Sequence, residues 1–458
     1  MMTNESFNLE EKDVYKLFNQ IRLEESEFNV MDEEVGKLQK LRIIKNLNKR
    51  IKGKNNLNVL KYGSAAAVIS LVLLVGVGTA SPALVENIPI LNSITQSISN
   101  KMGLHIDYIK YSQLVNKSVT NNGIKITINA VVADNSKLII GYTIKSDKKV
   151  EDLESYSLSR FLKINGKSFA SGGSAIGNYV DDYNFEESEE IHTTLPQDSD
   201  KFNVDLNITE IGNVKGKWDF GFSMSNTELS RSSTVFKPNK QLEFPSNTMN
   251  IEKVVFSPID TAIFISGRYK NEAAVSNSMS ELGLNSFLVY DDKGVELMPK
   301  GGQTAFISNP LLFNAELDFN NLKNIPKYLT VIPYSYSEVA SSDNSKIIDG
   351  TFPIVLSQGN FGKITINDIN TKNNETIVKY TAEGKAPAFQ ASDIFIKDAT
   401  GERVGVETTI ARENDEKPNE FTIGFKKLDP NKKYSIGTED LSNYELREDL
   451  KFNIELNK

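Results

Sequence analysis

The chain lacks cysteine altogether and has only two histidines and one tryptophan among its 458 residues. Without cysteine there is no disulfide framework, no thiol nucleophile and no Cys-containing zinc site. A Ser-His-Asp triad would have to use His105 or His192, and neither lies beside a nucleophile motif. The sequence therefore predicts no enzyme, no cofactor and no metal centre, with both histidines in ordinary surface or loop positions.

The chain has no excess of positive charge, because 52 Lys and Arg face 60 Asp and Glu and the formal net charge is -8. Nucleic-acid-binding domains normally carry a basic stripe, so we expect no direct contact with DNA or RNA. The one concentrated basic stretch, residues 37–61, directly precedes an apolar run. We assign this stretch to membrane topology and to attraction by anionic headgroups of the lipid bilayer.

Residues 63–80 form an uncharged, strongly apolar run of 18 residues, GSAAAVISLVLLVGVGTA. At a rise of ~1.5 Å per residue this run spans roughly 27 Å, close to the thickness of a hydrocarbon core once residues 81–84 are added. No acidic residue occurs between Glu34 and Glu86, while Lys and Arg are frequent before the run. The positive-inside rule then predicts one membrane-spanning helix, residues 63–84, with a cytoplasmic N-terminus and the later residues outside the cell membrane.

Two other interpretations of the apolar run stay open. Small residues at 79–81 resemble a signal-peptide cleavage site, but the preceding n-region would be some 60 residues long, whereas such regions are short. A buried core helix is the third interpretation, although such helices seldom combine a pure apolar run with a one-sided basic flank. We favour the membrane anchor.

Residues 1–62 have the pattern of two short amphipathic helices. Apolar residues recur at three- and four-residue steps and form two stripes: Val14, Leu17, Phe18 and Ile21, then Val35, Leu38, Leu41 and Ile44. Helices this short enclose little core, so the stripes either pack on each other or dock in the groove of a partner. We favour a partner-binding arm, with a marginally helical spacer as the alternative.

The region after the apolar run repeats one plan three times. Each copy starts with an alternating hairpin ending on tyrosine, at residues 123–142, 249–269 and 362–380. Two short strands around a glycine-containing turn follow, at residues 161–169, 287–297 and 394–404. A further alternating strand comes next, at residues 202–208, 315–319 and 421–425. Short strands with frequent turns are typical of β-sandwiches, and the long repeat indicates tandem domains instead of a solenoid.

These patterns predict a mainly β protein with short cytoplasmic helices, one transmembrane helix and two or three tandem, immunoglobulin-like β-sandwich domains outside. The expected segments are an arm (1–62), a membrane helix (63–84), a juxtamembrane linker (85–107) and sandwiches at 108–238, 239–357 and 358–458.

Three further features have mainly structural interpretations. Acidic residues cluster between residues 181 and 190, and we expect a solvated loop, with a calcium loop as the weaker alternative because no ordered D-x-D-x-D-G spacing occurs. The glycine-rich residues 172–177 are not followed by the lysine of a phosphate-binding loop, so we expect a flexible loop. The repeated Tyr142, Tyr269 and Tyr380 are expected in the domain cores.

The whole layout resembles a known family of single-pass membrane proteins. The resemblance rests on the basic-ended helix pair, the single apolar run, residues 80–83 (ASPA), residues 87–90 (NIPI), and residues 123–129 (GIKITIN) with Asp134 and Tyr142. The family occurs in Gram-positive bacteria, carries an extracellular β-rich domain of unknown function, and includes many proteins described as anti-sigma factors for extracytoplasmic-function sigma factors. The resemblance covers roughly residues 10–235, and residues 244–269 look like the second β-domain that commonly follows in this family.

The resemblance implies regulation: the cytoplasmic arm would sequester a sigma factor, and the outer domains would sense the envelope. The chain lacks the His-x3-Cys-x2-Cys element of zinc-binding anti-sigma factors, so contact with a sigma factor would rest on the two apolar stripes. The alternative is a non-enzymatic envelope-binding or spacer protein that holds a polysaccharide or another protein. An enzyme would need a pocket with perturbed titratable groups, which a sequence does not reveal.

Overall fold

The computed structural model describes residues 108–456 except for residues 135–136, 150–157, 170–172, 194, 197–200, 213, 277–285, 307–308, 338–341, 373–374 and 415. All of these residues belong to one compact unit, residues 78–458. The predicted arm, membrane helix and juxtamembrane linker lie outside the described residues. Within the described part, no helix is long and apolar enough to cross a bilayer.

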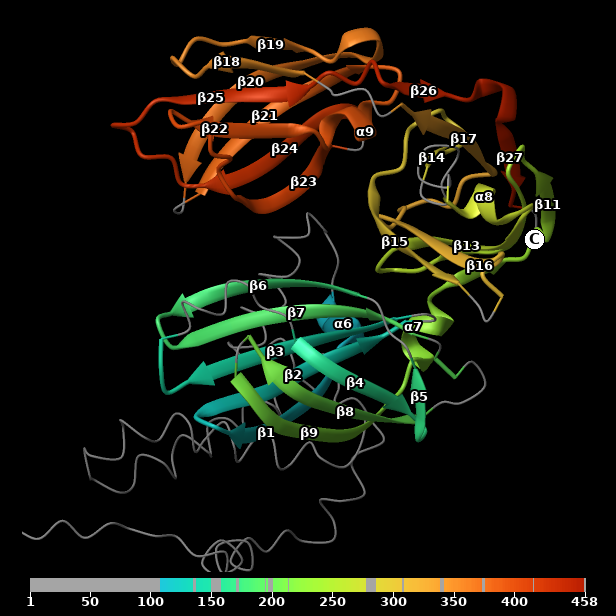
Figure 1. Cartoon of the computed structure of the whole chain (residues 1–458), viewed down its shortest axis with the longest axis vertical. Coiled ribbons are helices and arrows are strands. Elements are labelled where there is room, and N and C mark those ends of the chain that lie inside the picture. Colours follow the sequence, from blue (N-terminus) through green and yellow to red (C-terminus); the bar gives the residue numbers. More distant parts are fainter. Residues whose placement is uncertain are drawn as a thin grey trace, which may run out of the picture. The chain divides into compact units, whose positions relative to one another are not determined.

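The described region is mainly β and contains three pairs of antiparallel sheets (Figure 1). In the first pair, the five-stranded sheet has the order β1 (Gln113–Asn121), β2 (Ile124–Ala133), β3 (Lys137–Ser146), β7 (Asn184–His192), β6 (Gly173–Asp181). The facing sheet has the order β5 (Lys167–Phe169), β4 (Leu158–Ile164), β8 (Phe202–Ile211), β9 (Val214–Met224). Both sheets contribute to one core around Trp218, which is fully buried. We call this pair sandwich 1; α6 (Tyr108–Tyr111) precedes it and α7 (Thr227–Arg231) follows it.

Sandwich 2 has the same plan. Its larger sheet contains β10 (Thr234–Phe236), β11 (Lys240–Glu243), β12 (Asn247–Phe256), β13 (Thr261–Tyr269), β16 (Leu312–Phe319) and β15 (Pro299–Phe306). Its smaller sheet is built around β17 (Tyr328–Tyr336), which pairs with β14 (Phe287–Tyr290), β26 (Tyr444–Leu446) and β27 (Phe452–Glu455). The short helix α8 (Glu272–Ser276) follows β13.

Sandwich 3 repeats the plan once more. Its larger sheet has the order β19 (Ile354–Ser357), β20 (Gly362–Lys372), β21 (Glu375–Gly384), β24 (Lys417–Lys426), β23 (Val406–Asn414). Its smaller sheet has the order β18 (Asp343–Ile347), β25 (Tyr434–Glu439), β22 (Ile394–Asp398). Three short helical segments complete the described elements: η3 (Gly359–Phe361), α9 (Pro387–Ala391) and η4 (Glu448–Leu450).

The three predicted hairpins are confirmed as β2–β3, β12–β13 and β20–β21. Each carries a register shift at the same place, after Ile128, Ile251 and Ile366, where one extra residue enters the first strand. The tyrosine of each second strand is buried as expected, with exposures of 0–1% for Tyr142, Tyr269 and Tyr380. The shared bulge supports the internal repeat independently of the hydrophobic pattern.

Two of the expected loops are strands. The acidic residues 184–190 belong to β7, and the glycine-rich residues from Gly173 belong to β6. A side chain at Gly177 would overlap the Phe185 ring, so the glycine permits close packing of neighbouring strands instead of providing flexibility. Repeated glutamates conceal the strand pattern of β7, because a period-two signal depends on apolar residues.

This finding also corrects the alignment of the three copies. In the larger sheets, the strand beside β3, β13 or β21 is β7, β16 or β24, respectively. The alignment of the three repeats predicted from the sequence instead matched residues 202–208 with the strands now seen as β16 and β24. In the structure these residues belong to β8, which pairs with β4 in the smaller sheet. The true counterpart of β16 is therefore the acidic strand β7.

Sandwiches 2 and 3 exchange their last strands. In sandwich 1, β9 follows β8 directly and pairs with it. In sandwich 2, the strand that follows β17 is β18, but β18 pairs with β25 of sandwich 3. In return, β26 and β27, which follow β25, pair with β17 of sandwich 2 (Figure 1). The predicted division after residue 357 places β26 and β27 in the third domain, whereas their hydrogen bonds and the buried Ile454 belong to sandwich 2.

We expect Ile454→Ala to destabilise sandwich 2 by about 2–5 kcal/mol, because this side chain is fully buried in its core. Native-state hydrogen exchange on the full chain measures the effect. Amides of β14 and β17 should exchange faster, while those of β22 and β25 keep their protection. Glu455→Ala, on an exposed neighbour in the same strand, is the matched control. Faster exchange confined to β22 and β25 would contradict the strand exchange.

Candidate functional site: a buried charge cluster

Charged side chains of sandwiches 1 and 2 meet in one buried cluster. Sandwich 1 supplies Lys137 at the start of β3 and Glu190 and His192 at the end of β7; register pairs Lys137 with His192 and Ile139 with Glu190. Sandwich 2 supplies Asp260 from the β12–β13 turn, Lys300 from β15, and Glu316 and Asp318 from β16. We call these seven residues the junction cluster.

The alternation of β7 and β16 explains why charged residues gather here. On β16, Ala315, Leu317 and Phe319 face the core of sandwich 2, so Glu316 and Asp318 lie on the opposite face of the sheet. On β7, Ile191 lies in the core of sandwich 1 between Glu190 and His192. The outer face of each sheet is therefore polar at this place, yet the packing of one sandwich on the other buries it.

Lys137 is the centre of the cluster, and its side chain is fully buried. Its Nζ lies 3.5 Å from Glu190 Oε1 and 3.3 Å from Asp318 Oδ2, and it forms an ion pair with Asp260 Oδ2. Lys300 Nζ lies 3.0 Å from Glu190 Oε2 and 4.0 Å from Asp260 Oδ2. Each of the two ammonium groups thus contacts carboxylates of both sandwiches.

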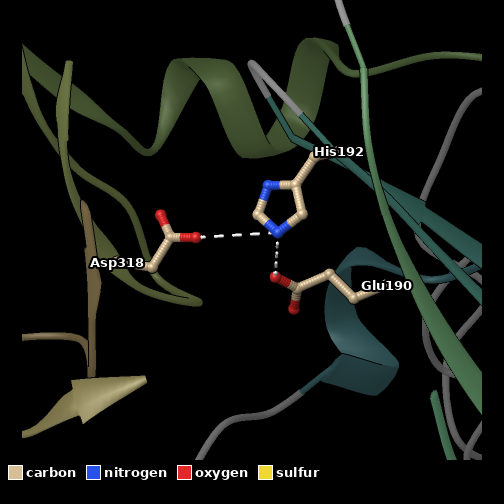
Figure 2. A group of neighbouring side chains, drawn as sticks. All are labelled: Glu190, His192 and Asp318. Carbon is tan, nitrogen blue, oxygen red and sulfur yellow. Dashed lines mark ion pairs between the residues drawn. The ribbon is translucent and has the colours of Figure 1, made fainter. Parts of the chain in front are cut away.

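His192 contacts three carboxylates. Its Nε2 lies 3.4 Å from Glu190 Oε1 and 3.9 Å from Asp318 Oδ2. Dashed lines mark these two ion pairs in Figure 2. Its Nδ1 lies 3.6 Å from Glu316 Oε2. The expectation of an ordinary surface or loop position for His192 is wrong, because only 7% of the residue is exposed. His105 lies outside the described residues.

The pKa values in the cluster shift in both directions. Burial raises the pKa of Asp318 to about 7, although the Lys137 charge opposes the shift. Burial also favours the neutral forms of Glu190 and Asp260, but the Lys137 and Lys300 charges outweigh it and lower both pKa values. Burial lowers the pKa of His192, whereas the neighbouring Glu316 carboxylate raises it, with a net increase. Asp318 therefore titrates near neutral pH, and the pKa of His192 lies above its usual value.

Glu190, His192 and Asp318 could in principle hold a metal ion, since one ligand atom of each lies within 4.8 Å of the others (Figure 2). The Lys137 ammonium, however, already contacts the same carboxylates of Glu190 and Asp318. A divalent cation bound to those oxygens would face this ammonium at short range in a medium of low dielectric constant. The Lys137 ammonium therefore stands where a metal cation would bind, and the arrangement is a salt-bridge network.

A second buried polar group lies inside sandwich 1. The Tyr142 hydroxyl donates a hydrogen bond to Glu189 Oε2 at 3.0 Å, and Arg160 forms an ion pair with Glu189 Oε1. Glu187, Glu189 and Glu190 are at most 6% exposed. The prediction of a solvated acidic loop is therefore wrong for these glutamates, which are buried opposite basic or hydroxyl groups.

The eight stripe residues predicted to bind a partner lie outside the described residues, so their role stays a prediction. Five residues of the junction cluster were not predicted from the sequence: Lys137, Asp260, Lys300, Glu316 and Asp318. The alternation of charged and core residues in β16 was a possible signal of the cluster, because this strand is buried on both faces. A sequence does not distinguish that situation from a strand with one solvated face.

We expect Lys137→Met to cost about 3–5 kcal/mol, because it leaves buried carboxylates without their central cation. Urea unfolding of the full chain, followed by the fluorescence of the single Trp218 in the core of sandwich 1, measures this cost. Lys125→Met, at an exposed position in the same hairpin, should change stability by under about 0.5 kcal/mol. Equal effects of the two substitutions would show that the cluster contributes little.

We expect the stability of this junction to fall as pH rises from about 4 to about 7. The folded-state pKa of Asp318 lies near 7, above an unfolded value near 3.9, so the folded chain binds more protons in this window. The raised pKa of His192 acts in the same direction, since its stabilisation is lost as pH rises through the folded-state value.

Unfolding of Asp318→Asn at pH 5 and pH 8 tests this dependence. The substitution should flatten the pH profile and stabilise the protein at pH 8 relative to wild type. Asp205→Asn, at an exposed position on β8, should leave the profile unchanged. A wild-type profile that rises between pH 5 and pH 7 would contradict the assignment.

Comparison with known proteins gives two family matches, each covering part of the chain. Residues 54–146 match the model described as "Domain of unknown function (DUF4179)", and residues 233–356 match "Family of unknown function (DUF5643)". No curated protein matches. A conserved domain protein from Bacillus anthracis, known from its crystal structure, is 22% identical with a TM-score of 0.42, covering 54% of this chain and 86% of that chain. This last similarity is too low to carry an argument, and both matched families are of unknown function.

Proposed function

We propose that this protein is a membrane-anchored regulator: an anti-sigma factor that sequesters an extracytoplasmic-function sigma factor. In this proposal residues 1–62 bind the sigma factor, residues 63–84 span the cell membrane, and the β-rich region, with immunoglobulin-like sandwiches, senses the envelope outside. The observation that carries the proposal is the joining of a small apolar-striped arm to a large β region through a single apolar run with a basic flank.

Contacts between neighbouring sandwiches support a role in passing a signal along the described region. The junction cluster joins sandwich 1 to sandwich 2, and the exchanged strands join sandwich 2 to sandwich 3. Glu296 adds a further link, because its carboxylate accepts hydrogen bonds from the backbone N–H groups of Ala388 and Phe389 at 2.8 and 3.1 Å. A disturbance at one sandwich would therefore affect contacts of the next.

The contacts of His192 support a non-enzymatic function. A catalytic triad requires a histidine between a nucleophile and an orienting acid. The ion-pair partners of His192 are Glu190, Glu316 and Asp318, so acids occupy both sides of the ring. Such a histidine can gain or lose a proton, and the ion-pair partners that the described residues give it are all carboxylates.

We expect the full chain, extracted from membranes in detergent, to retain a co-expressed extracytoplasmic-function sigma factor in a pull-down. Leu17→Asp together with Phe18→Asp should reduce retention at least tenfold, because two charges would enter the apolar stripe. Asn19→Asp together with Gln20→Asp adds the same charge beside the stripe and should retain the sigma factor. Failure of the wild-type chain to retain any sigma factor of its host would sink the proposal.

The second candidate is a non-enzymatic envelope-binding or spacer protein. The observation that favours it is the interlocking of sandwiches 2 and 3, which would suit a stiff projecting element. Deletion of residues 1–35 distinguishes the two candidates by transcript profiling. Loss of a regulator's arm should derepress a set of sigma-dependent genes, whereas loss of a spacer's arm should leave transcription unchanged.

A further inference from the structure

A pocket lies where β17 pairs with the exchanged strand β26. Its volume is about 440 Å³, within the range of roughly 300–1,000 Å³ typical of small-molecule sites. Its lining comes from three segments far apart in sequence: the β11–β12 connection, the end of β17 and the C-terminal segment. The residues that matter for the argument are Ser246, Tyr336, Asn443, Tyr444 and Arg447.

Two tyrosine rings form an aromatic platform in this pocket. Tyr336 and Tyr444 are directly paired in register, with ring centroids 5.9 Å apart and an angle of 41° between the ring planes. Tyr444 is held in place by Tyr334 at 5.9 Å and by Phe389 at 5.2 Å. Phe361 also packs against it at 6.3 Å. The platform is therefore rigid before any ligand binds, which lowers the entropic cost of binding.

The polar groups around the platform have unused hydrogen-bonding capacity. The side-chain Oδ1 of Asn443 is buried and has no hydrogen-bond partner in the described part of the chain. An unsatisfied buried acceptor is costly, so a ligand donor at this place would be favoured. The Arg447 guanidinium is fixed by Asp449, with N–O distances of 2.8 and 2.6 Å. Ser246 and the tyrosine hydroxyls add groups that can both donate and accept.

We infer that this pocket binds a saccharide. A sugar ring presents a face of C–H groups, which packs on aromatic rings, and a rim of hydroxyls, which pairs with amides, hydroxyls and guanidinium groups. The platform and the polar rim described above match both requirements in one cavity. The ring of one sugar unit lies against Tyr336 and Tyr444, and one of its hydroxyls donates to Asn443 Oδ1.

Binding at this place also affects the strand exchange. The pocket closes only when β26 is paired with β17, since Asn443, Tyr444 and Arg447 belong to the exchanged segment. A bound saccharide therefore stabilises the exchanged arrangement over any state in which the C-terminal segment is released. The inference concerns residues 245–447 alone and does not depend on the sigma-factor arm.

The test uses the detergent-solubilised full chain and three trisaccharide probes, built from glucose, N-acetylglucosamine or galactose. Saturation-transfer NMR detects binding, and calorimetry gives the Kd. We expect at least one probe to bind and to slow hydrogen exchange of β17 and β26. Tyr336→Leu should weaken binding at least tenfold, whereas Tyr183→Leu, at an exposed tyrosine of sandwich 1, should leave the Kd unchanged.

Asn443→Ala is the second variant, because it removes the unpaired acceptor and leaves the platform in place. It too should weaken binding severalfold. Hydrogen exchange of β12 and β13 in the ligand-free variants verifies that sandwich 2 stays folded. The inference is overturned if none of the three probes binds to the wild-type chain, or if both Tyr336→Leu and Asn443→Ala bind as tightly as wild type.

Discussion

The edges of β17 and β25 impose the constraint on which the arrangement of sandwiches 2 and 3 depends. A strand edge without a neighbour leaves a row of backbone N–H and C=O groups unpaired, and proteins cover such edges. In sandwich 1 the next strand of the same copy, β9, covers the edge of β8. In the other two copies each edge is covered by the strand that follows the other copy, β27 for β17 and β18 for β25. The smaller sheet of each of these two sandwiches therefore includes a strand that follows the other copy in the sequence.

The junction between sandwiches 1 and 2 uses charge where the other junction uses strand pairing. Removing carboxylates and ammonium groups from water is costly, and the cost is offset only when each charge has partners of opposite sign. Lys137 meets this condition by contacting carboxylates of both sandwiches. The two junctions therefore respond to different conditions. The stability of the junction between sandwiches 1 and 2 depends on pH, through Asp318 and His192. The junction between sandwiches 2 and 3 depends on the pairing of the C-terminal strands β26 and β27 with β17.

Local pattern predicted much of the fold. The three hairpins, the buried tyrosines and the paired strands after each hairpin follow from apolar alternation and turn residues, which act over a few neighbouring residues. The prediction failed at β7, where glutamates occupy both faces of a strand, and at His192, whose burial depends on another sandwich. The candidate site could not be predicted, because Asp260 and Asp318 lie more than a hundred residues beyond Lys137 in the chain. No spacing rule connects them.

The sequence by itself determined the repeated β units, the single apolar run and the absence of thiol chemistry, because each depends on residue type and short-range order. The tertiary structure alone decided which edge each final strand covers and which charges are buried. Both edges accept an antiparallel strand by the same backbone hydrogen bonds, so strand pattern does not specify the partner. That choice depends on side-chain packing, as in the burial of Ile454 in sandwich 2 and the contacts of the partly buried Tyr444 with rings of both sandwiches.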